Sequence, residues 1–325
     1  MKIGTIGTGF IVKAFIDAAI KNNIEIEAIY SRKQETADEL ANQFGIKKTY
    51  ISLEAMLQDL EVDFIYVASP NSLHYEQSLQ ALLAGKNVIC EKPFTTTSKE
   101  LAHLIEIASK RHLYLFEAIT NIHLPNFKIV QDHLKDLGNI KIVQCNYSQY
   151  SSRYDALRAG ELPNVFNPKF SGGAIMDINI YNIHFVMRLF GEPQNARYFC
   201  NQHLNGIDTS GIVIMEYPDF IVECVGAKDT RSLNMAQIQG EKGYISIPQG
   251  ANGISEVQIH LTKEDHVFNI QEENNRMYYE LSDFKTIYET NSYSQCEELL
   301  QHSLKVIKLI EKVRREANIF FAADK

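Results

Sequence analysis

The first 117 residues alternate short apolar runs with stretches of helical periodicity. The apolar runs have the length of strands and lie at residues 3–6, 26–30, 64–67, 88–90 and 114–116. The helical stretches lie between them, at residues 36–44, 53–60, 76–84 and 99–111. Alternating strands and helices predict right-handed crossovers and a parallel, doubly wound sheet. Helices cover both faces of such a sheet, which accounts for the apolar character of its strands.

The pattern changes after Pro125. A helix to residue 137, a strand at 140–150 and a polar loop precede an apolar helix at 173–190. Residues 195–270 hold strand-length runs separated by short turns, which favour an antiparallel or mixed sheet. A final helix at 293–316 carries an apolar stripe. We therefore predict an α/β chain with a doubly wound domain at 1–118. An α+β domain with a mostly antiparallel open sheet follows at 119–325, its last helix packing back on the domains.

Composition narrows the function classes. The 325 residues are 45% hydrophobic and 22% charged, an ordinary globular balance. The net charge of −8 disfavours a nucleic-acid partner, because phosphate backbones attract basic surfaces. No apolar run approaches the roughly 20 residues of a membrane helix, and we expect no signal peptide before the apolar run that starts near Lys2. The five cysteines are scattered without a CxxC pair, which is typical of reduced thiols in the cytoplasm, and the histidines show no metal-ligand spacing.

A glycine loop follows the first apolar run and opens a helix. It contains Gly7, Gly9, Phe10 and Ile11. Glycines at such a turn let the backbone approach a pyrophosphate, whose charge the helix N-terminus favours. Val12 stands where a third small residue is usual, so the glycine pair alone is a weak signal. Its place between a strand and a helix predicts a dinucleotide site.

The second strand bears on the choice between NAD and NADP. An acidic residue at its carboxyl tip would bind the ribose hydroxyls of NAD, but Glu27 lies inside the strand. The tip carries Ser31 and Arg32 instead, and a hydroxyl beside a guanidinium suits the 2′-phosphate of NADP. Alternatively, Arg32 is an ordinary solvated arginine at the start of a helix and the cofactor is NAD.

Three further segments carry candidate chemistry. Ser69, Pro70, Asn71 and His74 follow one expected strand, and Glu91-Lys92-Pro93 ends the next. Both lie where ligands bind in open parallel sheets. The third segment is the apolar helix that begins Gly172-Gly173 and contains Asp177, Tyr181 and His184.

With these motifs the whole chain resembles the glucose–fructose oxidoreductase, inositol dehydrogenase and rhizopine catabolism (Gfo/Idh/MocA) family. The resemblance implies a Rossmann domain followed by a domain whose open sheet often mediates homodimerisation. It also implies that Lys92 lies near the nicotinamide and the substrate oxygen, and that Asp177 and Tyr181 occupy the family's catalytic helix. Tyrosine at that position looks like the branch with dihydrodiol dehydrogenases, in which NADP is frequent, and not like the inositol dehydrogenases.

The chemistry of these side chains fits such roles. Asp177 and Tyr181 are four residues apart and so share a helix face, with His184 three residues further on. A phenol with a pKa of about 10 exchanges protons poorly at neutral pH, and a nearby ammonium such as Lys92 favours its ionised form. We expect Tyr181 to exchange the hydroxyl proton and Lys92 to polarise the substrate oxygen, while Asp177 orients the lysine or the substrate hydroxyl.

Other residues leave alternatives open. His184 either contacts substrate or is a buried histidine with its hydrogen bonds satisfied, and His74 is more readily a structural group than a proton carrier. Asn121, His123 and Asn164 are candidates for substrate contact. Asn179 departs from the family pattern, since a glycine is usual there, and we expect it to crowd its helix face.

Together these features predict a cytoplasmic oxidoreductase using NADP, with NAD possible, on a sugar, polyol or similar hydroxylated molecule. The alternative is a regulatory protein that binds the dinucleotide as a sensor and has lost turnover. Retention of Lys92, Asp177 and Tyr181 together argues against a sensor, which needs only the nucleotide site.

Overall fold

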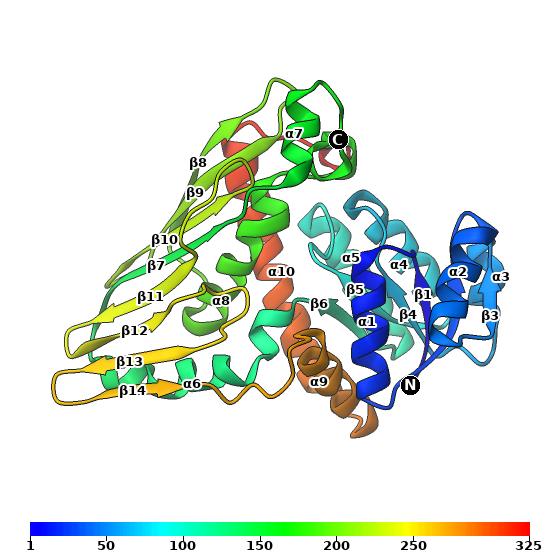
Figure 1. Ribbon diagram of the computed structural model, residues 1–325, viewed down its shortest axis with the longest axis horizontal. Helices are drawn as coiled ribbons and strands as arrows, with labels where there is room; N and C mark the ends of the chain where they lie inside the picture. Colours follow the sequence, from blue (N-terminus) through cyan, green and yellow to red (C-terminus); the bar gives the residue numbers. More distant parts are fainter. The chain divides into compact units, whose positions relative to one another are not determined.

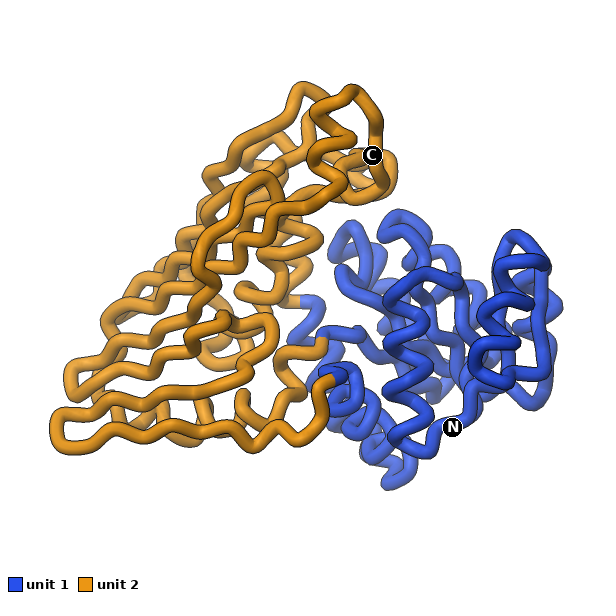
Figure 2. Tube along the Cα trace, in the orientation of Figure 1, with its two compact units in different colours: residues 1–119, 275–304 blue, residues 120–274, 305–325 orange.

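A computed structural model describes residues 1–325, and the chain divides into two compact units (Figures 1 and 2). Unit 1 comprises residues 1–119 and 275–304, and unit 2 comprises residues 120–274 and 305–325. The return of residues 275–304 to unit 1 departs from a simple division into 1–118 and 119–325. The reason is that the second half of the chain supplies two helical segments to the first unit.

Unit 1 is built on a six-stranded parallel sheet in the order β3-β2-β1-β4-β5-β6. The strands are β1 Lys2–Ile6, β2 Glu25–Tyr30, β3 Lys48–Tyr50, β4 Phe64–Val67, β5 Asn87–Glu91 and β6 Leu115–Ala118. Strands β4 and β6 are buried along their whole length, as expected when helices cover both faces. The strand order reverses between β1 and β4, which is where ligands bind in doubly wound folds.

Five helices connect these strands: α1 Phe10–Lys21, α2 Gln34–Phe44, α3 Leu53–Leu57, α4 His74–Leu83 and α5 Ser98–Arg111. Local sequence sets their ends. Thr97 and Glu100 form a capping box that starts α5, and Gly45 adopts the left-handed conformation that ends α2. Helix α9 (Met277–Glu289) packs on α1, and α10 (Tyr293–Glu316) is divided between the units at residues 304 and 305.

Unit 2 contains an eight-stranded sheet in the order β14-β13-β12-β11-β7-β10-β9-β8. The strands are β7 Ile140–Ser148, β8 Asn195–Gln202, β9 Asp208–Glu216, β10 Ile221–Ala227, β11 Met235–Gly240, β12 Gly243–Ile247, β13 Val257–Leu261 and β14 Asp265–Phe268. Only the β7–β10 pair is parallel, so the expected mostly antiparallel sheet is confirmed.

Helices cover one face of this sheet. Helix α6 (Pro125–His133) packs on β13, and α8 (Ile180–Phe190) packs on β7 and β10. The other face alternates polar residues with exposed apolar ones, among them Phe199 at 61% exposure and Ile221 at 54%. We call it the open face.

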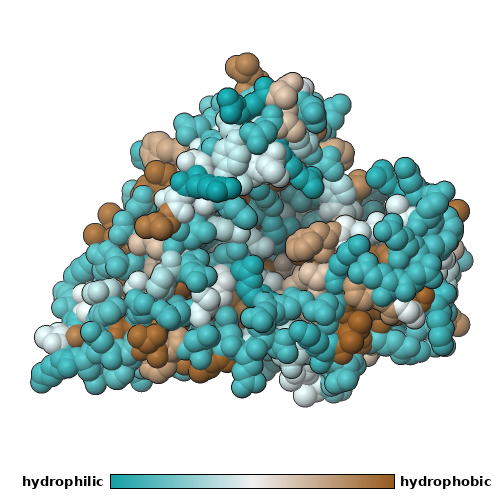
Figure 3. All heavy atoms as spheres, in the orientation of Figure 1, coloured by the Kyte–Doolittle hydropathy of each residue, from teal (hydrophilic) through white to brown (hydrophobic).

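Several elements differ from the sequence expectations. Residues 175–179 form a π-helical turn where a continuous α-helix from 173 to 190 was expected, and the polar loop after β7 contains α7 (Ser152–Arg158). Helix α9 and strand β3 were not anticipated. No helix is both long and apolar enough to cross a bilayer, and on the face in Figure 3 apolar side chains are scattered over a mainly hydrophilic surface.

Candidate active site

Unit 1 gathers four of the candidate segments at one edge of its sheet. Gly7 follows β1, Ser31 follows β2, Ala68 follows β4 and Lys92 follows β5. Because these strands are parallel neighbours, the segments lie side by side at what we call the carboxyl edge.

The glycine loop has the geometry that a phosphate group requires. Gly7 has φ +108°, and a Cβ there would lie 3.0 Å from the Ala68 carbonyl oxygen, so only glycine fits without strain. Gly9 caps α1, whose first turn carries no acidic side chain, so the helix N-terminus can accept an anion. Phe10 is 84% exposed beside it, and Ile11 is also exposed.

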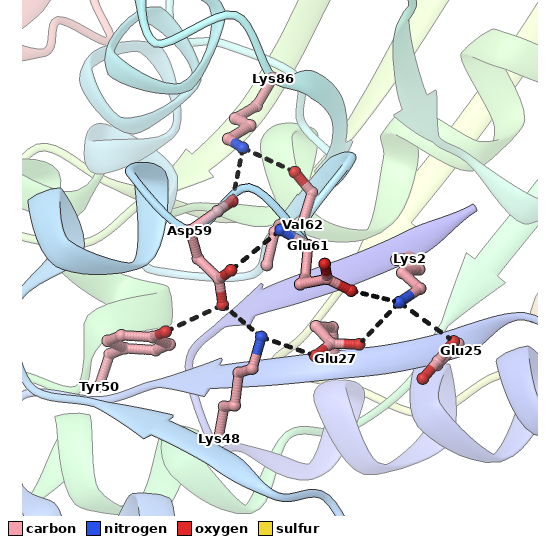
Figure 4. Close-up of polar contacts among 9 residues, drawn as sticks. All are labelled: Lys2, Glu25, Glu27, Lys48, Tyr50, Asp59, Glu61, Val62 and Lys86. Carbon is pink, nitrogen blue, oxygen red and sulfur yellow. Dashed lines mark hydrogen bonds and ion pairs between the residues drawn. The ribbon is translucent and has the colours of Figure 1, made fainter.

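The structure explains why Glu27 is no candidate for ribose binding. Glu27 is the extra residue of a bulge where β2 pairs with β1. Figure 4 shows its carboxylate between Lys48, at 2.8 Å, and Lys2, at 3.6 Å, which begin β3 and β1. The hydrogen bond from Lys48 lowers the pKa of Glu27. The carboxylate is therefore engaged at the amino ends of the strands.

The tip of β2 is occupied by Ser31 and Arg32. The Ser31 hydroxyl shares a 2.7 Å hydrogen bond with that of Thr36 on α2, which fixes the turn. Arg32 is exposed, as is the neighbouring Lys33. A guanidinium at this position remains available to an anionic group of a ligand.

His74 joins two loops of the carboxyl edge. Its ring nitrogens lie 2.9 Å from the carbonyl oxygens of Pro93 and Ser69, and its residue is only 1% exposed. Burial lowers its pKa, although the two carbonyls favour the protonated ring. This geometry supports the structural role of His74 over direct contact with the cofactor, whereas Pro70 and Asn71 remain partly exposed.

Buried groups hold the loop that carries Lys92 through hydrogen bonds. The Tyr66 phenol donates a 2.6 Å hydrogen bond to Glu91, and the Glu117 carboxylate accepts one of 3.1 Å from the Phe94 amide. Glu91 and Glu117 are 7% and 5% exposed, whereas Lys92 is partly exposed. Glu91 is thus placed to support the loop, and Lys92 is the member that a ligand can reach.

Glu117 has an unusual acidity. Burial raises its pKa to about 7, and the nearby carboxylate of Glu91 acts in the same direction. Hydrogen bonds from Ser303 and the Phe94 amide, and the charge of Lys92, oppose this effect. The group therefore changes charge in the neutral range.

We expect unit 1 to lose stability as the pH rises from about 4.5 to 7, and Glu117→Gln to weaken that dependence, because Glu280 is a second buried carboxyl of unit 1 with a raised pKa. Over this range the folded state holds a proton that the unfolded carboxyl has released. The free energy of unfolding therefore falls by up to about 1.4 kcal/mol per pH unit, and by about 3 kcal/mol over the full range. Urea unfolding between pH 4.5 and 8 measures the effect. Glu39→Gln, on the exposed surface of α2, is the control, and equal pH dependence in all three proteins would contradict the assignment.

Unit 2 carries the second group of candidates on one helix, the π turn Ile175–Asn179 followed by α8, which we call the site helix. Its start is tightly fixed. Asp208 accepts hydrogen bonds from the Ile175 amide at 2.6 Å and the Tyr198 phenol at 2.7 Å. A Cβ on Gly173 would lie 2.1 Å from the Asp208 carboxylate, which accounts for this glycine.

The sequence suggested that Asn179 crowds its helix face. In the structure Asn179 is buried and binds the helix to strand β10. Its amide donates a 2.9 Å hydrogen bond to the Cys224 carbonyl on β10, and Asn182 donates another to Val225. A Cβ on Gly226 would lie 2.4 Å from that of Asn179, so the missing side chain of Gly226 gives Asn179 its space. These contacts hold the π turn against β10.

The accessible part of the site helix presents Asp177 and Tyr181. Asp177 forms an ion pair with Lys228, which directly follows β10. The ring of Tyr181 meets that of Tyr147 on β7 edge to face, with centroids 6.0 Å apart. Both Asp177 and Tyr181 are partly exposed, and a π turn of this kind is frequent at functional sites.

The remaining candidates take different positions. Asn121 is fully buried and donates to the carbonyl oxygens of Tyr181 at 2.8 Å and Ala251 at 3.1 Å, so it braces the site helix. His184 is fully buried. His123 is partly exposed and Asn164 is exposed.

Sequence reasoning missed four residues: Lys228, Tyr147, Glu117 and Asp208. Lys228 left a usable signal, because a Lys-Asp pair ends an apolar strand-length run at 221–227. The other three depend on contacts between segments far apart in the chain.

Residues 1–119 match the family described as "Oxidoreductase family, NAD-binding Rossmann fold", and residues 133–246 match the GFO/IDH/MocA C-terminal domain. The NADP(+) scyllo-inositol 2-dehydrogenase IolU of Bacillus subtilis is 34% identical, over 100% of this chain and 99% of that protein. Trans-1,2-dihydrobenzene-1,2-diol dehydrogenase of Xenopus tropicalis is 29% identical over 75% of this chain and 73% of that protein.

Among solved structures, the 3-ketoreductase KijD10 of Actinomadura kijaniata, in complex with NADP and TDP-benzene, has a TM-score of 0.83. It is 21% identical and covers 97% of both chains, a likeness of fold. Both an inositol dehydrogenase and a dihydrodiol dehydrogenase are thus among the relatives of this chain.

Proposed function

The chain belongs to the Gfo/Idh/MocA family of NAD(P)-dependent oxidoreductases, and we propose that it moves a hydride between NADP(H) and a hydroxyl-bearing carbon of a cyclic polyol or sugar. NADP would supply or receive the hydride at its nicotinamide. The residues of this chain would bind the two reactants and handle the proton and the charge on oxygen.

One observation favours NADP over NAD. Arg32 and Ser31 occupy the tip of β2, while Glu27, the acidic residue of that strand nearest the expected spacing, is engaged by Lys48 and Lys2. A carboxylate at the tip would repel a 2′-phosphate, whereas a guanidinium binds it in a planar fork. The similarity to a dehydrogenase named for NADP(+) agrees with this.

The candidate site residues of unit 2 suit a ligand with a polyhydroxylated ring. The Asp177 carboxylate accepts hydrogen bonds, the phenols of Tyr181 and Tyr147 can donate or accept, and their rings offer apolar faces. A cyclic polyol presents hydroxyl groups, which these polar groups can bind, and C–H surfaces, which can pack on the aromatic rings. The name of IolU supports this substrate class.

Each catalytic candidate has one role in the proposal. Lys92 donates to the substrate oxygen, where negative charge builds during hydride transfer. Tyr181 exchanges the hydroxyl proton, and Asp177 accepts a hydrogen bond from a substrate hydroxyl and so orients it.

The open face of the sheet in unit 2 supports a homodimer. Besides Phe199 and Ile221, it exposes Ile142 and Tyr244, each at 38%. A hollow of about 600 Å³ lies on it, lined in part by Phe199, Ile212 and Val225. Exposed apolar surface of this kind is typical of subunit interfaces.

We place the enzyme in the cytoplasm. The cytoplasm supplies NADP(H), and its reducing conditions suit the five free cysteines.

We expect NADPH to bind more tightly than NADH, and Arg32→Ala to lower NADPH affinity by about 10- to 100-fold while NADH affinity changes little. Loss of a charge-assisted hydrogen-bond pair to phosphate is worth about 1.5–3 kcal/mol. Fluorescence titration of the protein with each cofactor measures both constants. Glu35→Gln, on the exposed first turn of α2, is the matched control.

A preference for NADH would overturn the choice of cofactor. The substrate class is tested separately, by measuring turnover with NADP on inositols, other polyols and sugars. Absence of turnover on the whole panel, with NADP bound, would contradict the proposed activity.

A further inference from the structure

We propose that Lys228 is a positioning residue of the active site, which holds the Asp177 carboxylate ionised and aimed at the substrate. The inference rests on the proposed function, because it gives Asp177 the task of accepting a hydrogen bond from a substrate hydroxyl.

The backbone of Lys228 is fixed on both sides. Its amide donates to the Thr209 carbonyl at 2.9 Å, and its carbonyl accepts from the Ser151 amide at 2.9 Å. Lys228 thereby continues the alignment of β10 beyond its last residue, Ala227. The direction of its side chain follows from the sheet and not from a mobile loop.

Burial differs between the two partners in a way that suits a site. The Lys228 side chain is 10% exposed and that of Asp177 is 30% exposed. The carboxylate is therefore the more accessible member of the pair. A buried ammonium is costly unless it is paired, so Lys228 itself requires this carboxylate. The ring of Phe166, 6.0 Å from the ammonium, forms part of its apolar surroundings.

The helix that carries Asp177 is fixed to the same strand as Lys228. Asn179 and Asn182 bind the carbonyl oxygens of Cys224 and Val225, and Gly226 allows the close approach. Both members of the ion pair are thus held through β10. The π turn places Asp177 toward the end of β10, where Lys228 stands.

Other titratable groups surround the pair. The elements packed against the π turn contribute Asp208 from β9, Tyr147 and Cys145 from β7, Cys224 from β10, and Tyr181 and His184 from α8. Asp208 is engaged by the Ile175 amide and Tyr198, and Asp229, next to Lys228, by the hydroxyls of Thr209 and Ser210. Lys228 contacts Asp177 directly, so its removal takes a positive charge away from a partly buried carboxylate that has acidic neighbours.

Lys228→Met is therefore expected to move the titration of the Asp177 carboxyl upward by at least about one pH unit, and Lys228→Arg to restore most of the shift. Carbon-13 NMR of protein labelled at aspartate carboxyls measures it, with the Asp177 signal assigned by its loss in Asp177→Asn. In kinetics, the acid limb of the kcat/KM profile should shift in the same direction. Near pH 7, where the carboxyl is still ionised, kcat/KM should fall about 10-fold because the carboxylate is no longer held toward the substrate.

Lys141→Met is the matched control, since Lys141 forms an exposed ion pair with Glu241 at the opposite end of β7. It should leave both the Asp177 titration and the pH profile unchanged. A Lys228→Met protein that folds but titrates at Asp177 as the wild type does would overturn the proposal. If the wild-type protein turned over no polyol or sugar, the proposed function would fail, while the NMR titration would still decide the role of Lys228.

Discussion

Replacing Lys92 by methionine is expected to lower kcat by at least about 10²-fold while the affinity for NADPH changes by less than about threefold. Lys92 directly follows β5 and is the partly exposed member of an otherwise buried loop. A preorganised donor to a developing oxyanion contributes about 3–4 kcal/mol to the transition state and little to cofactor binding. Steady-state kinetics and fluorescence titration separate the two effects.

The loop offers an internal check on this expectation. His74 and Glu117 hold the backbone of Pro93 and Phe94 through hydrogen bonds that the Lys92 side chain does not form, so these bonds remain in Lys92→Met. Lys99→Met, on the exposed side of α5, is the control for loss of a positive charge from unit 1. A Lys92→Met enzyme that kept kcat within threefold of the wild type would exclude Lys92 as the polarising group.

The sheet of unit 1 could be predicted from sequence because its strands are buried on both faces. Such strands read as continuous apolar runs, and four of the five expected ones agree with β1, β2, β4 and β5 to within one residue at either end. Strand β3 escaped because its three residues, Lys48–Tyr50, are half-buried at the edge of the sheet and form no apolar run. Helix α9 was not predicted for a related reason. Tyrosines stand among its apolar and polar residues, so the helical periodicity of its apolar positions is hard to recognise.

The site was predictable where the residue type follows from local backbone geometry. Gly7 could be recognised because its conformation and close neighbour admit no side chain, and Lys92 because it directly follows a buried strand and precedes a proline. The π turn could not be recognised, because five residues with a wider turn barely alter the periodicity of an apolar helix. The pairing of Asp177 with Lys228 joins residues 51 positions apart and depends on how the site helix meets β10.

Asn179 illustrates how a departure from a family pattern can be compensated. A larger residue on the helix is matched by Gly226 on the strand, where no side chain fills the space. The polar amide gains a buried partner in the Cys224 carbonyl, so the substitution adds a contact between helix and strand instead of a clash. The position therefore bears on the rigidity of the site helix and not directly on the substrate.

Tyr181→Phe is expected to lower kcat by about 10²-fold and to remove the pH dependence that proton exchange imposes on kcat. The substitution keeps the ring that meets Tyr147 and removes only the hydroxyl group that would carry the proton. The site helix should stay in place, because Asn121 binds the backbone carbonyl of residue 181 and not its side chain. Kinetics from pH 6 to 10, with unfolding measured in parallel, distinguish lost chemistry from lost structure.

Tyr217→Phe is the matched control, since it removes a buried phenol that donates a 2.7 Å hydrogen bond to the Gly191 carbonyl elsewhere in unit 2. That change should lower the free energy of unfolding by about 1 kcal/mol and leave kcat unaltered. Near-normal turnover in Tyr181→Phe would exclude Tyr181 as the proton carrier and move that role to another group or to water. A loss of turnover shared equally by the two variants would instead mean that the effect of Tyr181→Phe is structural.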